Sequence, residues 1–223
     1  MDRSLKRKPY SFLLNAPIAD SSDIIAIVKT SNETDEDLAK IKIPGWRYAQ
    51  IDIEALNLFD KADVHAMPLQ VFDIVKKMSV NCIPYSYFGE KHVRDFEDIS
   101  KDAFTVIFTK LSKNYIFFND DTIVERINFS IMHEIGHIIL GHKGYSSLAE
   151  IEANHFAVRT LCPVEILEYL KIDSKTEIAR MFNVSEEFAE NRIKDLENRK
   201  SWFPSKHIET IRSKIIDRFI LKK

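Results

Sequence analysis

The residues best suited to chemistry in this chain form the run His133-Glu134-Ile135-Gly136-His137, an HExxH motif. Two histidines four residues apart lie one above the other on a helix face, so both imidazoles can reach one cation at about 2.0–2.1 Å. Glu134, beside the first histidine, is placed to accept a proton from a water molecule that the cation activates. The spacing therefore predicts a hydrolytic metal site, with zinc as the expected ion.

A catalytic zinc also needs a third protein ligand. Residues 149–161 contain no Gly or Pro and predict a second helix, which can return beside the first after a short loop and ends before Pro163. Glu150 and Glu152 lie two residues apart on this helix, so they cannot both face the metal. Glu150 is favoured because Asn154, four residues later, can orient a ligand histidine. Glu152 stays open as the alternative.

Three runs in this region carry a family pattern: 126–137, 150–157 and 161–163. An Arg-x-x-Phe-Ser lead enters HExxH, a Glu-x-x-Ala-Asn-x-Phe-Ala helix follows, and a Leu-Cys-Pro segment ends it. This arrangement resembles the ImmA/IrrE family of metallopeptidases. The resemblance implies these site residues: metal ligands His133, His137 and Glu150, and catalytic carboxylate Glu134.

The resemblance also implies an activity and a partner. Known members are intracellular zinc peptidases that cleave transcriptional repressors, so the expected substrate is a protein, such as a helix-turn-helix repressor or an antitoxin-like regulator. One Zn²⁺ is the expected cofactor, although Mn²⁺ or Fe²⁺ also suits a His₂Glu site. Two alternatives stay open: a metal-dependent sensor without significant protease activity, which an intact Glu134 disfavours, and a DNA-binding regulator.

The composition is that of a globular protein, with 45% hydrophobic and 30% charged residues among 223. A net charge of −2 predicts no general affinity for nucleic acid. Cys82 and Cys162 are far apart in the sequence and are expected to be buried free thiols in a reducing compartment. No apolar run approaches the roughly 18 residues of a membrane helix. A cytoplasmic protein without a membrane partner is therefore expected, and nothing in the pattern specifies an oligomeric state.

The elements that must position the motif predict an α+β fold, with a zincin-like core in which a small antiparallel sheet packs against the HExxH helix, followed by a helix-turn-helix-like region. The predicted domains are an N-terminal segment of unknown role (1–45), a metallopeptidase domain (46–163), a helix-turn-helix-like region (164–198) and a basic tail (199–223). The expected helices span 51–62, 68–78 and 164–170, with the HExxH helix beginning near Thr122, and the expected strands span 80–87, 103–109 and 115–119.

The helix-turn-helix-like region is acidic. Residues 174–198 contain four Lys/Arg and six Asp/Glu, and the second helix opens with Glu186 and Glu187. DNA affinity depends largely on cationic contacts with phosphates, so a structural or protein-facing role is favoured over direct nucleic-acid binding. The tail has eight Lys/Arg against two Asp/Glu. Its apolar stripe favours a terminal helix packed on the body over docking to an acidic partner, nucleic acid or a membrane surface: Ile208, Ile211, Ile215 and Phe219.

Overall fold

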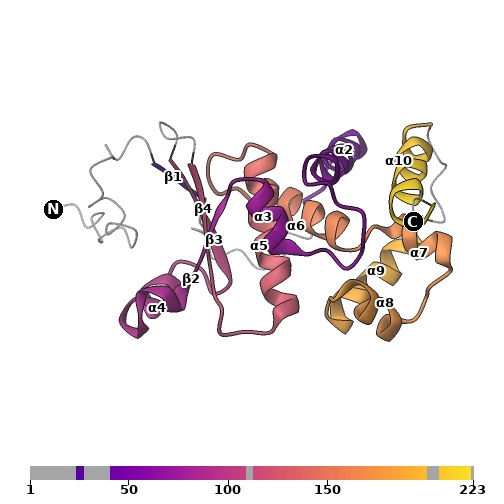
Figure 1. Cartoon of the computed structure of the whole chain (residues 1–223). Coiled ribbons are helices and arrows are strands. Elements are labelled where there is room, and N and C mark those ends of the chain that lie inside the picture. The colour runs from indigo at the N-terminus through magenta and orange to yellow at the C-terminus, as the bar shows by residue number, and fades with distance from the viewer. Residues whose placement is uncertain (1–23, 28–40, 109–112, 200–205, 222–223) are drawn as a thin grey trace.

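The computed structural model describes residues 24–27, 41–108, 113–199 and 206–221. A small sheet lies between α4 on one face and α3 and α5 on the other, and α2 and the helices from α6 onward follow beyond α5 (Figure 1). In chain order the elements are β1 (Ile24–Ile27), α2 (Gly45–Lys61), α3 (Val71–Lys77), β2 (Asn81–Pro84), η3 (Tyr85–Phe88), α4 (Glu90–Glu97), β3 (Ala103–Phe108), β4 (Lys113–Phe118), α5 (Val124–Ile139), α6 (Ser147–Leu161), α7 (Val164–Leu170), α8 (Lys175–Phe182), α9 (Glu186–Arg199), α10 (Lys206–Ile216) and η4 (Asp217–Leu221).

The sheet has the strand order β1-β3-β4-β2, and its mixture with helices confirms the predicted α+β class. β3 pairs antiparallel with both β1 and β4. β2 differs from the expected antiparallel pattern, because it runs parallel to β4. The chain between these two strands contains η3, α4 and β3, which is long enough to return it to the same end of the sheet.

Successive side chains of β3 point to opposite faces of the sheet, and each face contributes to a separate hydrophobic cluster. Phe104, Val106 and Phe108 face a small aromatic cluster that also contains Phe96 of α4. Ala103 belongs to the larger core on the opposite face. Thr105 lies on that same face, because successive side chains of a strand point to opposite sides, and its hydroxyl reaches α5. The sheet therefore presents the hydroxyl group of Thr105 to the HExxH helix.

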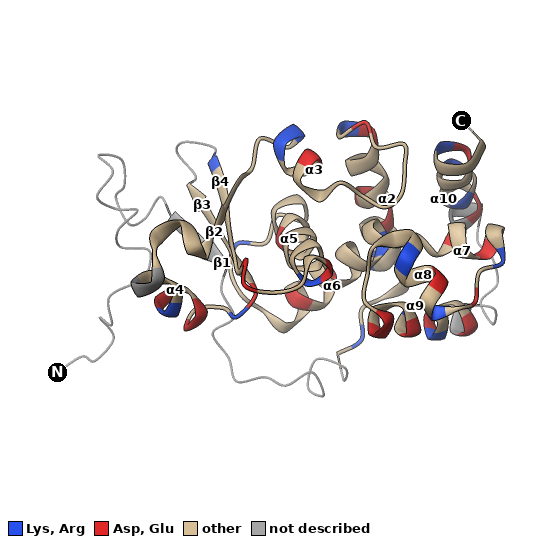
Figure 2. Cartoon of the chain, turned by 60° about the horizontal axis from the view of Figure 1, so that its bottom comes forward, with Lys and Arg blue, Asp and Glu red and all other residues tan. Residues whose placement is uncertain are grey.

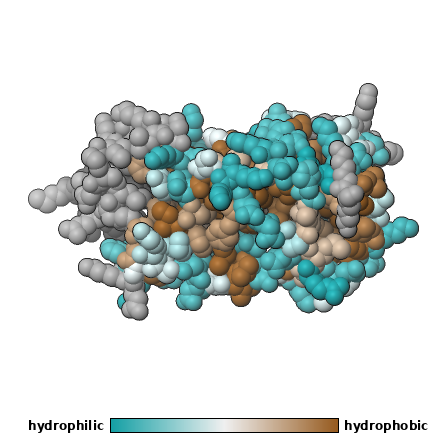
Figure 3. Space-filling view, in the orientation of Figure 1, coloured by the Kyte–Doolittle hydropathy of each residue, from teal (hydrophilic) through white to brown (hydrophobic). Residues whose placement is uncertain are grey.

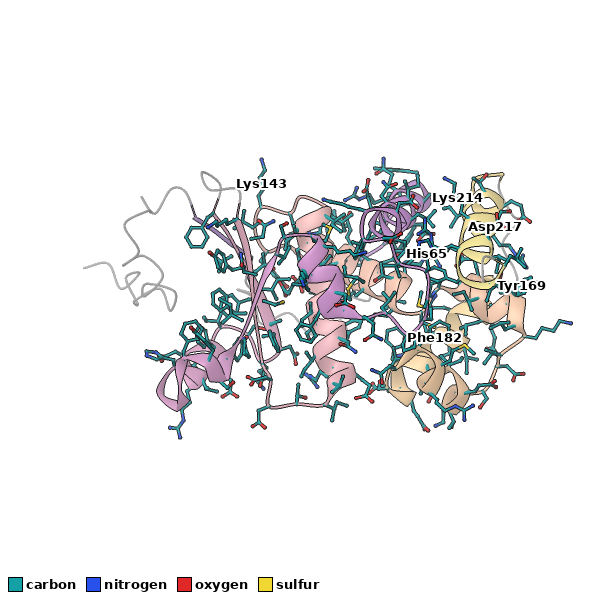
Figure 4. The ribbon with its side chains drawn as sticks, in the orientation of Figure 1. His65, Lys143, Tyr169, Phe182, Lys214 and Asp217 are labelled. Atoms are coloured by element: carbon teal, nitrogen blue, oxygen red, sulfur yellow. The ribbon has the colours of Figure 1, made fainter. Side chains whose placement is uncertain are left out.

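The second half of the chain is helical. Phe182 of α8 is buried against the body of the protein (Figure 4). In the helix-turn-helix-like region Ile178, Val184, Ala189 and Leu196 are buried too, whereas Phe188 and Ile193 are half-buried. α10 packs against α2 and α7, with Ile211, Ile215 and Phe219 buried. The expectation of a terminal helix packed on the body is thereby met over the part of the tail that the structure describes.

The proposed division into domains stays a prediction. Of the N-terminal segment 1–45, residues 24–27 and 41–45 are described, and the rest lies outside the described residues. Within the described ranges, no helix combines the length and apolar character that crossing a membrane requires. Hydrophilic and hydrophobic residues are interspersed on the face shown in Figure 3.

Candidate metal centre

α5 and α6 bring three potential metal ligands together. His133 and His137 lie one turn apart on α5, and their Nε2 atoms are 2.9 Å apart. Glu150 lies in the first turn of α6, which begins after the N-cap Ser146. Its carboxylate oxygens lie 3.4 Å from His133 Nε2 and 3.3 Å from His137 Nε2. Among the described residues, these three side chains form a group that could hold a metal ion.

The dimensions of this group suit a small divalent cation. A tetrahedral ion with ligands at about 2.0–2.1 Å holds neighbouring donor atoms roughly 3.3 Å apart. Here the two imidazole nitrogens are 2.9 Å apart, and each lies 3.3 or 3.4 Å from a different oxygen of the Glu150 carboxylate. Two imidazole nitrogens at this distance are joined either by one shared N–H proton or by a cation that both lone pairs bind. The donor set of two imidazoles and one carboxylate is also one that zinc prefers.

The two candidate glutamates occupy different environments. Glu150 faces the histidines, whereas Glu152 contacts His142 and Arg47. Asn154 Oδ1 accepts a hydrogen bond of 2.8 Å from His133 Nδ1, which is the orienting contact expected from the sequence. Glu150 as third ligand stays a prediction, and this geometry supports it over Glu152.

Burial and the neighbouring side chains shift the pKa of Glu150 in opposite directions, and the same is true of His137. Burial alone would raise the pKa of Glu150, but hydrogen bonds with His133 and His137 outweigh it and hold the pKa well below its usual range. Burial lowers the pKa of His137, with Glu150 only partly offsetting it. For His137 and Glu150 this gives a neutral imidazole beside an ionised carboxylate, the protonation state in which both can bind a cation. The pKa of His133 is instead raised, because the lowering effect of burial is outweighed by its contacts with Glu150 and Glu134.

Glu134 lies on the side of α5 that faces the sheet. It is 5% exposed, and burial raises its pKa to about 7, against the lowering effects of His133 and Thr105. The hydroxyl of the fully buried Thr105 donates a hydrogen bond of 2.6 Å to Glu134 Oε2. A carboxylate with a pKa near neutrality is well suited to accept and return a proton.

We expect Thr105→Val to impair catalysis without unfolding the protein. Valine keeps the shape of threonine, but Glu134 loses a hydrogen bond worth about 1.5–3 kcal/mol, so kcat should fall about tenfold or more. Because the hydroxyl lowers the pKa of Glu134, its loss should move the acidic limb of the pH–rate profile to higher pH. Thr105→Ser, which keeps the hydroxyl, should retain most activity. An unchanged profile in the valine variant would remove Thr105 from the site.

Gly136, inside the HExxH motif, permits the close packing of α5 on α6. A Cβ at this position would lie 3.2 Å from Ala153 Cα and 3.2 Å from Phe156 Cβ. One of these neighbours is backbone, so it cannot turn away. Ala153 lies one turn after Glu150 on α6. The absent side chain therefore helps to bring Glu150 within reach of the histidines.

Gly136→Val is expected to lower the free energy of unfolding by about 1–3 kcal/mol, since the extra methyl groups must push the helices apart. It should also weaken zinc affinity, because Glu150 moves with α6. Gly144→Val is the matched control, since nothing lies within 4 Å of a Cβ there. Thermal unfolding and chelator competition measure the two effects, and equal behaviour of the two variants would contradict the prediction.

Other polar residues near the motif are His142, Lys143, Tyr145 and His155. His142 contacts Glu152, and His155 contacts Asp52. Lys143, in the loop between α5 and α6, is exposed and points away from the body (Figure 4). Tyr145 is half-buried in the same loop.

Comparison with known proteins agrees with the site. A family model of the M78 peptidases, described as the IrrE N-terminal-like domain, matches residues 78–194, more than half of the chain. The matched segment contains α5 and α6 with all three potential ligands, whereas α2 precedes it. A search of the curated proteins found no match. The resemblance inferred from the sequence motifs is confirmed, and the chain belongs to the M78 peptidase family, with a metallopeptidase-type domain of the IrrE N-terminal kind.

Proposed function

We propose that this protein is an intracellular zinc-dependent endopeptidase that hydrolyses a peptide bond in a specific protein, a helix-turn-helix repressor or an antitoxin-like regulator. The observation that carries the proposal is the buried Glu134 beside the three-residue donor group. A structural metal site needs no such carboxylate, and its raised pKa suits proton transfer. The free thiols Cys82 and Cys162 agree with a reducing compartment.

Each residue of the centre then has a defined task. His133, His137 and Glu150 bind the cation, which when bound activates water and polarises the scissile carbonyl group. Glu134 accepts the proton of the attacking water and delivers it to the leaving nitrogen. Thr105 holds the Glu134 carboxylate in place through its hydrogen bond.

The charges of the helical region favour a protein target over DNA. Asp and Glu residues line the outer side of α8 and α9 (Figure 2). Glu186, Glu187 and Glu190 are exposed at the start of α9, where a recognition helix would meet phosphates. Two of these carboxylates already pair with lysines, Glu186 with Lys175 and Glu190 with Lys194. This acidic surface disfavours binding to duplex DNA, which depends largely on cationic contacts with phosphates.

Cleavage of a purified repressor tests the proposal. The full-length protein would be incubated with Zn²⁺ and a helix-turn-helix repressor encoded beside it, in parallel with a chelator-treated sample and the Glu134→Gln variant. One new product, present only with active protein and zinc, is expected, and its mass gives the cut site. Cleavage that survives in both controls, or a salt-dependent shift of duplex DNA without any cleavage, would refute the proposal.

A further inference from the structure

α2 reaches the metal centre through one side chain, although it precedes the family-matched segment. Arg47, in the first turn of α2, donates from Nε to Glu152 Oε1 at 2.7 Å and from Nη2 to Glu152 Oε2. Such a two-bond contact fixes the carboxylate in orientation as well as in position. Glu152 is 4% exposed, so its charge needs a partner of this kind.

Two further contacts lead from Glu152 to His137, one of the expected metal ligands. Glu152 Oε2 lies 3.1 Å from His142 Nε2, and His142 Nδ1 lies 2.9 Å from His137 Nδ1. The side chain of His142 is 11% exposed and that of His137 is 1% exposed. A continuous line of hydrogen bonds therefore runs from Arg47 to His137, through partners on α2, α6 and the loop after α5.

The direction of each hydrogen bond follows from the guanidinium. Arg47 can only donate, and it keeps Glu152 as a carboxylate that can only accept. His142 must therefore carry its proton on Nε2, which leaves Nδ1 as an acceptor when the ring is neutral. His137 must then donate from Nδ1. This leaves the lone pair of His137 on Nε2, the atom that faces His133 and Glu150.

We propose that Arg47 is a positioning residue of the metal centre, which acts through Glu152 and His142 to fix the ring orientation and the tautomer of His137 that binds the cation. The inference rests on the role of His137 as a ligand in the proposed function. It assigns Glu152 a task other than metal binding. Asn154 orients His133 through one direct hydrogen bond. Arg47 orients His137 indirectly, through Glu152 and His142.

Metal affinity tests this inference without reference to peptidase activity. In Arg47→Met the zinc affinity, measured by competition with a chromogenic chelator, should fall about 10–100-fold, as is usual for lost partners of ligand histidines. The absorption spectrum of the Co²⁺-loaded protein should change as well. Arg47→Lys, which keeps the charge but not the two-bond contact, should give an intermediate loss. Glu152→Gln provides a second variant, which interrupts the same line of hydrogen bonds at the carboxylate that Arg47 contacts.

Arg218→Met is the matched control. Arg218 holds the other end of α2 by donating to the backbone oxygen of Val64 at 3.0 Å and by pairing with Asp60. Its loss removes an ion pair from the same helix but leaves the line to His137 intact, so zinc affinity should not change. If Arg47→Met and Glu152→Gln keep wild-type affinity, or if Arg218→Met lowers it equally, the inference is overturned. A wild-type protein that binds zinc but cleaves no repressor would defeat the proposed function alone.

Discussion

Replacing Glu134 by glutamine is expected to abolish peptide hydrolysis while leaving the metal bound. Glutamine has the shape of glutamate, but its amide cannot accept the proton of the attacking water. General acid–base catalysis by one side chain contributes about 10²–10⁴-fold, so kcat should fall by about 10³-fold or more. The three donor residues are untouched. Zinc content measured by mass spectrometry should therefore equal that of the wild type, with kcat measured on the cleaved repressor.

A glutamate elsewhere on the same helix provides the control. Glu125 lies in the first turn of α5, more than two turns before Glu134, and is half-buried. Glu125→Gln should retain wild-type kcat and zinc content. Full activity in Glu134→Gln would show that another group moves the proton, and loss of zinc from that variant would show that Glu134 supports the ligands rather than the reaction.

The helices around the motif could be predicted because their signals are local. The predicted helix 164–170 has the same bounds as α7, and α5 begins at Val124, close to the expected start at Thr122. Helical periodicity, proline and short polar loops act within a few residues of the elements that they delimit. The four-residue spacing of His133 and His137 is also a local signal, so it could be found from the sequence.

Other features depend on contacts that are distant in sequence. The helix α4 was not predicted, since its segment is mostly charged and its apolar residues pack on an aromatic cluster supplied by β3 and β4. The parallel pairing of β2 was missed for the same reason, because the partner strand lies beyond η3, α4 and β3. Local pattern specifies a strand, but not its neighbour.

The residues of the site also fall into those with partners near in sequence and those with distant partners. The group His133, His137 and Glu150 follows from one helix, a short loop and the next helix, so its members are near in sequence. Thr105 and Arg47 had no such signal, since they are 29 residues from Glu134 and 105 residues from Glu152 respectively. Residues that bind directly can thus be found by spacing, while residues that position them depend on the tertiary fold.

Replacing Arg159 by methionine is expected to lower the free energy of unfolding by about 3–5 kcal/mol. Its buried guanidinium donates to Asp52 of α2 at 2.7 Å and to Glu165 of α7 at 2.8 and 3.0 Å. Methionine fills much of the space, but two buried carboxylates lose this positive partner. For a chain of this length the melting temperature should fall by roughly 10 °C. Urea unfolding and calorimetry measure the change.

The triple variant Asp52→Asn, Arg159→Met, Glu165→Gln separates charge from packing. It removes the buried charges together, so it should recover much of the stability that Arg159→Met loses, since neutral replacements of a whole buried ion group are often tolerated. If the triple variant is no more stable than Arg159→Met, the loss reflects packing.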